Sequence, residues 1–174
     1  MTIEIYDNYL EKETLLLLQE NLTQPDFPWY YNKGKVGRNS LYGSDIIYDY
    51  QFVHTFFRDG MQSSNMCSRI KPLIDKLDPF CIKRIKANMT LITPEPIVYG
   101  MHRDFFAKKS LKTAIFYVNT NNGPTLFETN DEIKHVNAVE NRLVVFDSNI
   151  RHTGVSSSDT RYRIVLNINY YAQN

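Results

Sequence analysis

The sequence predicts a mainly β protein, an antiparallel sandwich or barrel such as a jelly roll, with N-terminal helices packed on one sheet. After about residue 80, eight short β-type runs follow one another with turn residues between them and no helical pattern. The segment “NTNNGPT” is a strong turn signal within this series. The helical patterns come before most of the strands, which favours helices on one outer face of the barrel.

The first half of the chain is expected to contribute two helices and three strands. They are a strand near 3–6, a helix over about 10–21, strands in “FPWYYN” and “YDYQFVHTFF”, and a second helix within “SSNMCSRIKPLIDKLDP”. Asp7 or Asn8 can cap the first helix, and Ser63 or Ser64 the second. The polar, glycine-containing loop “YNKGKVGRNSLYGS” is a candidate lid over a site.

Length and charge indicate one domain with no general affinity for polyanions. The 174 residues suit a single domain, 1–174, with helical support over about 1–80 and a β-barrel core over about 81–171. Twenty basic and nineteen acidic residues nearly cancel, so the net charge gives no overall attraction to nucleic acid or anionic membranes. No long apolar run predicts a membrane span, and we expect no signal peptide. Two cysteines without a framework spacing favour a reducing, cytoplasmic compartment.

The segment “YGMHRDFF” carries the first two candidate metal ligands. If it is a strand, His102 and Asp104 project from the same face, because side chains two apart share a face. His152 lies 48 residues beyond Asp104, in “NIRHTGV”, and reaches the pair only through the fold. Two histidines and one carboxylate form a facial triad, which leaves coordination positions open on a non-haem Fe(II) ion.

The same segment also contains His-Arg-Asp, the catalytic-loop triplet of protein kinases. A kinase needs asparagine five residues after the aspartate, where this chain has Lys109, and it needs a glycine-rich loop and Asp-Phe-Gly, which are missing from the sequence. We therefore expect Arg103 to face outward between two inward-facing ligands.

The last predicted strand supplies a cation for an anionic co-substrate. Arg161 follows His152 by nine residues, and a guanidinium offers paired donors to a carboxylate. One face of the strand is polar and is expected to line a ligand-bearing cavity; its members are Arg161, Arg163, Val165, Asn167 and Asn169. Arg163 shares this face and stays an alternative to Arg161.

Taken together, these motifs resemble the Fe(II)/2-oxoglutarate-dependent dioxygenases. The wording of “TAIFYVNTNNGPTLF”, “RLVVFDSNIRHTGV” and “TRYRIVLNINYY” is similar to the prolyl-hydroxylase-like branch, including its small phage-type members. The resemblance covers residues 81–171 and implies a double-stranded β-helix, which is a jelly roll. It also implies Fe(II), 2-oxoglutarate as co-substrate and O₂, with ascorbate as a supporting reductant.

The resemblance assigns roles to individual residues. It implies metal ligation by His102, Asp104 and His152, and binding of the 2-oxoglutarate distal carboxylate by Arg161, with Tyr117 bonded to the same carboxylate and Thr125 nearby. The sequence departs from the family at two positions. Asn122 replaces the first glycine of a Gly-Gly pair, where asparagine tolerates a positive φ. Asn167 stands where this branch has a bulkier or aromatic residue.

The implied function is hydroxylation of a substrate with release of succinate and CO₂. Prolyl residues of a peptide or protein, or a free amino acid, are the candidate substrates, and the expected compartment is the cytoplasm, or the host cytosol if a phage encodes the chain. A nucleic-acid demethylase of the same superfamily is an alternative, but it favours a basic groove and a second arginine beyond Arg163. A non-catalytic binding module on the same barrel is the other alternative. We expect His54 and His135 to be structural or exposed, and “KRIK”, residues 83–86, to be a solvated strand edge.

Overall fold

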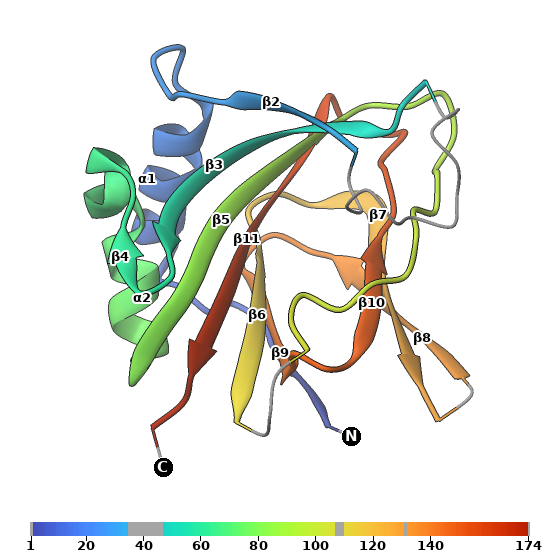
Figure 1. Ribbon diagram of the computed structural model, residues 1–174. Coiled ribbons are helices and arrows are strands. Elements are labelled where there is room, and N and C mark those ends of the chain that lie inside the picture. Colours follow the sequence, from blue (N-terminus) through green and yellow to red (C-terminus); the bar gives the residue numbers. More distant parts are fainter. Residues whose placement is uncertain (1, 35–46, 107–109, 131, 174) are drawn as a thin grey trace.

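Two antiparallel β-sheets face each other in the computed structural model, which describes residues 2–34, 47–106, 110–130 and 132–173 (Figure 1). This arrangement confirms the predicted mainly β, jelly-roll class with few helices. Most of the candidate lid loop, 31–44, lies outside the described residues, which omit 35–46.

The large sheet contains strands from both halves of the chain. Its order is β1 (Ile3–Tyr6), β9 (Arg142–Asp147), β6 (Leu111–Tyr117), β11 (Tyr162–Tyr171), β5 (Cys81–Leu91), β3 (Tyr50–Arg58) and β2 (Tyr30–Lys33), with the short β4 (Met61–Gln62) paired to β3. The first 80 residues therefore extend the sheet at both ends, besides supplying helical support. A strand that pairs with a partner far along the chain carries no local sequence signal for that partner. The predicted division at residue 80 therefore did not include the N-terminal strands in the main sheet.

The small sheet contains three strands in the order β10, β7, β8. Their bounds are Arg151–Gly154, Asn121–Thr129 and Glu132–Ala138. The segment “NTNNGPT”, residues 119–125, was predicted as a turn, but β7 already begins within it at Asn121. Because β10 pairs with β7, His152 is held opposite Phe127 in this sheet.

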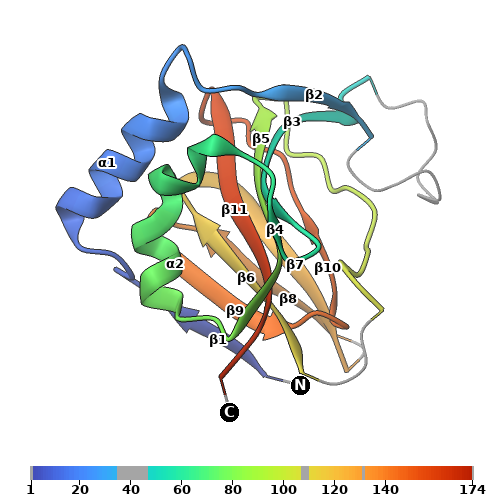
Figure 2. The same ribbon diagram turned by 60° about the vertical axis from the view of Figure 1, so that its left-hand side comes forward.

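The helices cover the outer face of the large sheet (Figure 2). They are α1 (Lys12–Thr23), the 3₁₀ helix Asn65–Ile70 and α2 (Lys71–Leu77). Ser64 caps the 3₁₀ helix, since its hydroxyl accepts from the Met66 amide at 3.0 Å. The predicted cap of α1 is wrong: the helix starts after Glu11 without a side-chain cap, and Asp7 instead pairs with Arg142 at 2.6 Å. No helix in these described segments is long and apolar enough to cross a membrane.

Two apolar cores lie on either side of the large sheet. The outer core joins the helices to the sheet, and it contains Leu15, Leu18 and Leu22 of α1 together with the alternate residues Ile164, Leu166 and Ile168 of β11. The inner core fills part of the space between the two sheets, and it includes Tyr117, Phe127, Phe146 and Val165. The predicted alternation of β11 is therefore confirmed, with its apolar face under the helices and its other face toward the small sheet.

Phe56 is expected to be a main support of the outer core. Its side chain is completely buried and packs against Phe27 and His54, at ring-centroid distances of 6.1 and 4.6 Å. Replacing Phe56 by alanine should lower the free energy of unfolding by about 3–5 kcal/mol, because it removes apolar contacts and leaves a cavity. Chemical denaturation measures this change. The exposed Phe80 is the matched control, and a similar loss in Phe80→Ala would contradict the assignment.

Candidate metal centre and its cavity

His102 and His152 meet through a single backbone bridge. The expectation that the His-x-Asp segment is a strand is wrong, because residues 101–106 are irregular apart from the pairing of His102 with His152. Each amide donates to the other residue's carbonyl oxygen, at 3.0 and 2.9 Å. The two imidazole rings are brought together as a result, with 4.8 Å between their centroids.

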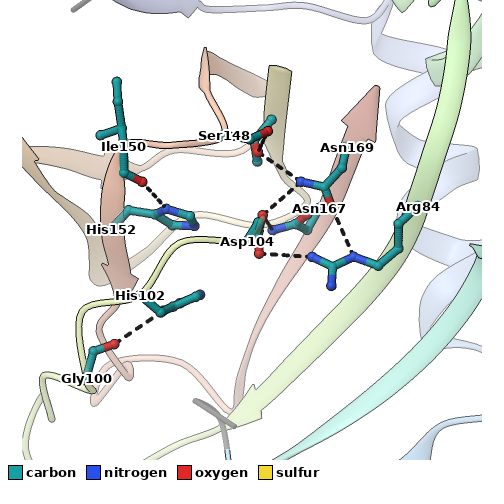
Figure 3. A network of polar contacts seen from close by, with 10 residues as sticks. Arg84, Gly100, His102, Asp104, Ser148, Ile150, His152, Asn167 and Asn169 are labelled. Atoms are coloured by element: carbon teal, nitrogen blue, oxygen red, sulfur yellow. Dashed lines mark hydrogen bonds and ion pairs between the residues drawn. The ribbon is translucent and has the colours of Figure 1, made fainter. Parts of the chain in front are cut away.

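The three predicted metal ligands converge on one point. Ligand atoms of His102, Asp104 and His152 all lie within 4.8 Å of one another. Nδ1 of His102 lies 3.3 Å from the Gly100 carbonyl oxygen, and Nδ1 of His152 lies 3.1 Å from that of Ile150 (Figure 3). When a ring donates its Nδ1 proton to a carbonyl, Nε2 carries a free lone pair, which is the arrangement of a metal-ligating histidine.

Both carboxylate oxygens of Asp104 accept hydrogen bonds from the large sheet. Arg84 on β5 donates to Oδ1 at 2.9 Å, while Asn167 and Asn169 on β11 donate to Oδ2 at 3.0 and 2.9 Å (Figure 3). Burial alone would raise the pKa of Asp104, but the neighbouring His152 and Arg84 and the hydrogen bonds from the two amides outweigh it. The pKa of Asp104 therefore lies well below its ordinary value, and the side chain is an anion at neutral pH.

A further layer of hydrogen bonds fixes the residues that hold Asp104. Asn169 also donates to the Thr113 hydroxyl at 2.9 Å and accepts from Nε of Arg84 at 3.0 Å. Thr113 in turn lies 2.8 Å from the Ser148 hydroxyl, and both side chains are fully buried. Such a network keeps a ligand carboxylate in one orientation.

His152 is suited to bind a cation because it is kept neutral. Burial lowers the pKa of His152, and the nearby His102 lowers it further, although Asp104 opposes both effects. Neutral imidazole is the form that ligates metals. Two imidazoles and one carboxylate, grouped beside open space, match the donor set of a facial triad for Fe(II).

Arg84 is a functional residue that the sequence interpretation missed. The expectation that “KRIK” is a solvated edge is wrong, because β5 lies inside the sheet between β11 and β3. Ile85 and Ala87 face the outer core, so Arg84 and Lys86 point to the opposite side, toward the small sheet. The sequence did contain a clue, because basic and apolar residues alternate over Arg84, Ile85, Lys86 and Ala87. Such alternation indicates a strand with one apolar face and one basic face.

Replacing Arg84 by methionine is expected to weaken binding of Mn(II) about tenfold, because Asp104 Oδ1 loses its donor and the carboxylate can rotate. Calorimetric titration of the folded protein measures the change. Arg142→Met is the control, since Arg142 pairs with Asp7 at the surface. Unchanged or tighter binding in Arg84→Met would show that the positive charge of Arg84, and not its positioning of Asp104, dominates.

A cavity of about 1250 Å³ opens beside the three ligands and is lined by residues of both sheets. Arg163 lies in this cavity and is only 6% exposed. Arg161 is exposed and lies outside it, because β11 begins at Tyr162. The expected placement of Arg161 in the cavity is thus wrong, and the alternative, Arg163, is the residue that the fold brings there.

Arg163 is surrounded by the other predicted co-substrate residues. Its guanidinium donates to the Gly123 carbonyl at 2.9 Å and to the Thr125 hydroxyl at 3.1 Å, and it lies 5.7 Å from the centre of the Tyr117 ring. The Tyr117 hydroxyl donates to Thr125 at 2.7 Å. No carboxylate in the described segments pairs with Arg163, although burying a guanidinium without a counter-charge is costly.

Gly123 allows the loop next to Arg163 to pack closely. A Cβ atom at this position would lie 2.5 Å from the carbonyl oxygen of Val155, so no other residue fits without moving the backbone. Asn122, which replaces the family's first glycine, lies in the extended strand β7 and is not among the described residues with positive φ. The substitution at 122 therefore needs no special conformation.

The remaining histidines have no place in the centre, as expected. His54 is buried, with its ring nitrogens 2.8 Å from the Pro28 carbonyl oxygen and 2.8 Å from the Ser64 hydroxyl. His135 is exposed on β8. Arg103, the middle residue of the kinase-like triplet, is exposed and donates to the Asn149 carbonyl at 2.7 Å.

Comparison with solved structures shows which fold this is. A prolyl-4-hydroxylase from Pseudomonas putida is 14% identical with a TM-score of 0.66, covering 98% of this chain and 92% of its own. A Burkholderia pseudomallei oxidoreductase of the 2OG-Fe(II) oxygenase family is 12% identical with a TM-score of 0.72, covering 99% and 86%. A Trichoplax adhaerens prolyl hydroxylase, in complex with a hypoxia inducible factor peptide fragment, is 15% identical with a TM-score of 0.66, covering 97% and 83%.

These likenesses confirm the predicted fold. The chain has the jelly-roll fold of 2-oxoglutarate- and Fe(II)-dependent oxygenases, including prolyl hydroxylases. No protein-family model and no curated protein matches the sequence itself. At such low identity the fold is shared, and the activity must be argued from the site.

Proposed function

We propose that this protein is an Fe(II)- and 2-oxoglutarate-dependent dioxygenase that hydroxylates a C–H bond of its substrate. The observation that carries the proposal is Arg163, a buried guanidinium with no carboxylate partner in the described residues, in the same cavity as a His-Asp-His donor set. A cation left unpaired in such a place requires an anionic ligand. The dicarboxylate 2-oxoglutarate supplies one.

The metal would be held by His102, Asp104 and His152. A bound ferrous ion supplies activation of O₂, with oxidative decarboxylation of 2-oxoglutarate to succinate and CO₂ coupled to oxidation of the substrate. The protein's own part is to present two imidazoles and one carboxylate in a fixed geometry. The hydrogen bonds from Arg84, Asn167 and Asn169 to Asp104 serve that purpose.

The distal carboxylate of 2-oxoglutarate would bind at Arg163. The Thr125 hydroxyl oxygen accepts hydrogen bonds from both Arg163 and Tyr117, so its own proton is left to donate to an anion. Arg163 and Thr125 together thus offer donors of fixed direction to one carboxylate, while the ring of Tyr117 closes one side. This assignment moves the co-substrate role from Arg161 to Arg163.

The fold does not identify the substrate. We propose a peptide, a protein or an amino acid. The Trichoplax prolyl hydroxylase binds a peptide on the same fold. Prolyl hydroxylation is accordingly the first activity to test. Fe(II), O₂ and 2-oxoglutarate are the required reactants, and ascorbate keeps the metal reduced.

A succinate assay tests the proposal. The purified chain with Fe(II), ascorbate and 2-oxoglutarate should release succinate in air and none under nitrogen, and a productive substrate should increase the rate. A panel of proline-bearing peptides, free amino acids and nucleic acids then separates hydroxylase from demethylase. No succinate, together with no thermal stabilisation by Mn(II) plus 2-oxoglutarate, would contradict the enzyme and favour a non-catalytic binding module.

A further inference from the structure

Lys86 is a further cation that lines the cavity, and it forms no bond to the candidate metal ligands. It lies on β5 between Ile85 and Ala87, which face the outer core, so its side chain points to the opposite side and lines the cavity. On the neighbouring strand β11 it is paired with Asn167, one of the residues that bind Asp104. Lys86 is thus placed close to the candidate metal centre.

The Lys86 amine has no partner within the described part of the chain, where it forms neither an ion pair nor a hydrogen bond. Burial lowers the pKa of Lys86 to about 8, and the positive charges of Arg84 and Arg58 act in the same direction. Asp104 is the carboxylate that opposes them, but both of its oxygens already accept hydrogen bonds. At neutral pH the side chain remains mostly an ammonium that lacks a counter-ion.

Two buried acceptors next to Lys86 also lack partners. Oδ1 of Asn167 and Oδ1 of Asn88 are buried and accept no hydrogen bond from the described residues. Asn167 is only 8% exposed, and its amide nitrogen is committed to Asp104, so its free oxygen cannot be exchanged for a donor. Both side chains line the cavity, and a buried acceptor without a donor costs free energy.

The combination of one ammonium and two acceptors defines a chemical class. The ammonium requires an anion, and the amide oxygens require N–H or O–H donors beside it. A phosphate or sulfate ester presents oxygen acceptors on every side and would face the two amide oxygens unfavourably. A carboxylate next to an N–H or O–H, as in an amino acid or at a peptide C-terminus, satisfies all three groups.

The Lys86 group is separate from the position proposed for 2-oxoglutarate. Arg163 is paired with Thr90, four residues beyond Lys86 on β5, which is about 13 Å along an extended strand. The cavity is therefore long enough for one carboxylate at each end.

We propose that Lys86, Asn88 and Asn167 form the subsite for the primary substrate, which carries a free carboxylate beside an N–H or O–H donor. This inference rests on the proposed function, because it assigns Arg163, at the opposite end of the cavity, to 2-oxoglutarate. It narrows the substrate to free amino acids and peptides whose C-terminus enters the cavity.

Matched acid and amide probes test the proposal by binding. The full chain, loaded with Mn(II) and saturated with 2-oxoglutarate under nitrogen, is titrated with L-proline and with N-acetylglycine. L-Prolinamide and N-acetylglycinamide are the partners without a carboxylate. Calorimetry or NMR should show the acids binding about tenfold or more tightly than the amides, since a charged hydrogen bond is lost in the latter.

Two lysine variants on one strand locate the effect. Lys86→Gln should remove the preference for acids, while Lys83→Gln should keep it. Lys83 does not line the cavity and pairs with Asp59 at 2.5 Å, so the control removes the same charge from the same strand without touching the cavity.

The possible results separate this inference from the proposed function. Equal affinity for acids and amides, no binding of either acid, or an acid preference that survives in Lys86→Gln overturns the substrate subsite. A Lys86→Gln variant that loses affinity for 2-oxoglutarate itself also overturns it, because Lys86 would then serve the co-substrate. Failure of the proposed function appears instead as absent succinate and absent 2-oxoglutarate binding, and the acid–amide comparison is then made on the Mn(II)-loaded protein alone.

Discussion

Replacing Asp104 by alanine is expected to abolish succinate formation and to weaken Mn(II) binding by more than about 100-fold. The carboxylate is the one anion among the three grouped donors, so its loss removes the negative charge that a divalent cation needs. The substitution also leaves the half-buried Arg84 beside the centre without its partner, since the 2.9 Å ion pair disappears. The uncompensated guanidinium then repels the metal, which adds to the loss of the ligand.

Calorimetric titration with Mn(II) and a succinate assay with Fe(II) measure the two effects. Asp75→Ala is the control, because Asp75 is exposed on α2 and pairs only with Lys71 four residues earlier. Asp104→Asn provides a second variant of the same size, for use if the alanine variant does not fold by circular dichroism. Metal affinity equal to that of the unmodified protein in either Asp104 variant would show that the ligand assignment is wrong.

Replacing Arg163 by alanine is expected to raise the dissociation constant for 2-oxoglutarate about 100-fold or more, with little change in metal binding. Truncating one partner of a buried, hydrogen-bonded charge pair costs about 2–5 kcal/mol, most of it from the group left unpaired. Arg163 is buried against Tyr117 and Thr125, so its removal would take the guanidinium donors away from a carboxylate bound at this end of the cavity. Arg163→Lys should recover only part of the affinity, because a single ammonium cannot reproduce the paired donors.

Arg161→Ala is the matched comparison, with the same residue type two positions earlier. Arg161 is exposed before the start of β11, so its removal should change the dissociation constant by less than about twofold, as for an ordinary surface charge. Titration of the Mn(II)-loaded variants with 2-oxoglutarate decides between them. A larger effect in Arg161→Ala than in Arg163→Ala would restore the assignment made from spacing alone.

The sequence was sufficient to predict which three candidate ligands come together, because their residue types and order are typical of one chemistry. His102, Asp104 and His152 do converge, although the reason given for the first two was wrong. They were expected on a strand, whereas the segment is irregular and is fixed by one backbone bridge to His152. The spacing of two residues predicted that His102 and Asp104 would point the same way. In the structure, the backbone pairing of His102 with the distant His152 fixes this segment instead.

The choice between Arg161 and Arg163 could not be made from sequence. Both belong to the same period-two face, and only the start of β11 and its register against β5 decide which of them reaches the cavity. Arg84 and Lys86 were missed for a related reason. A run of charged residues is typical of a solvent-exposed edge strand. The local sequence does not show that β5 is flanked by β11 and β3 within the sheet.

The Asp104 network also fixes the order in which the protein can assemble. The carboxylate is bound by residues 20, 63 and 65 positions away along the chain, and none of these hydrogen bonds is local. Contacts at such separations form only after the loop-closure entropy of the intervening chain has been overcome. The pocket for the cation is therefore among the last parts of the molecule to form, and an unfolded or half-folded chain has no preorganised site to offer. A metal ion that binds this pocket would consequently favour completely folded molecules by mass action.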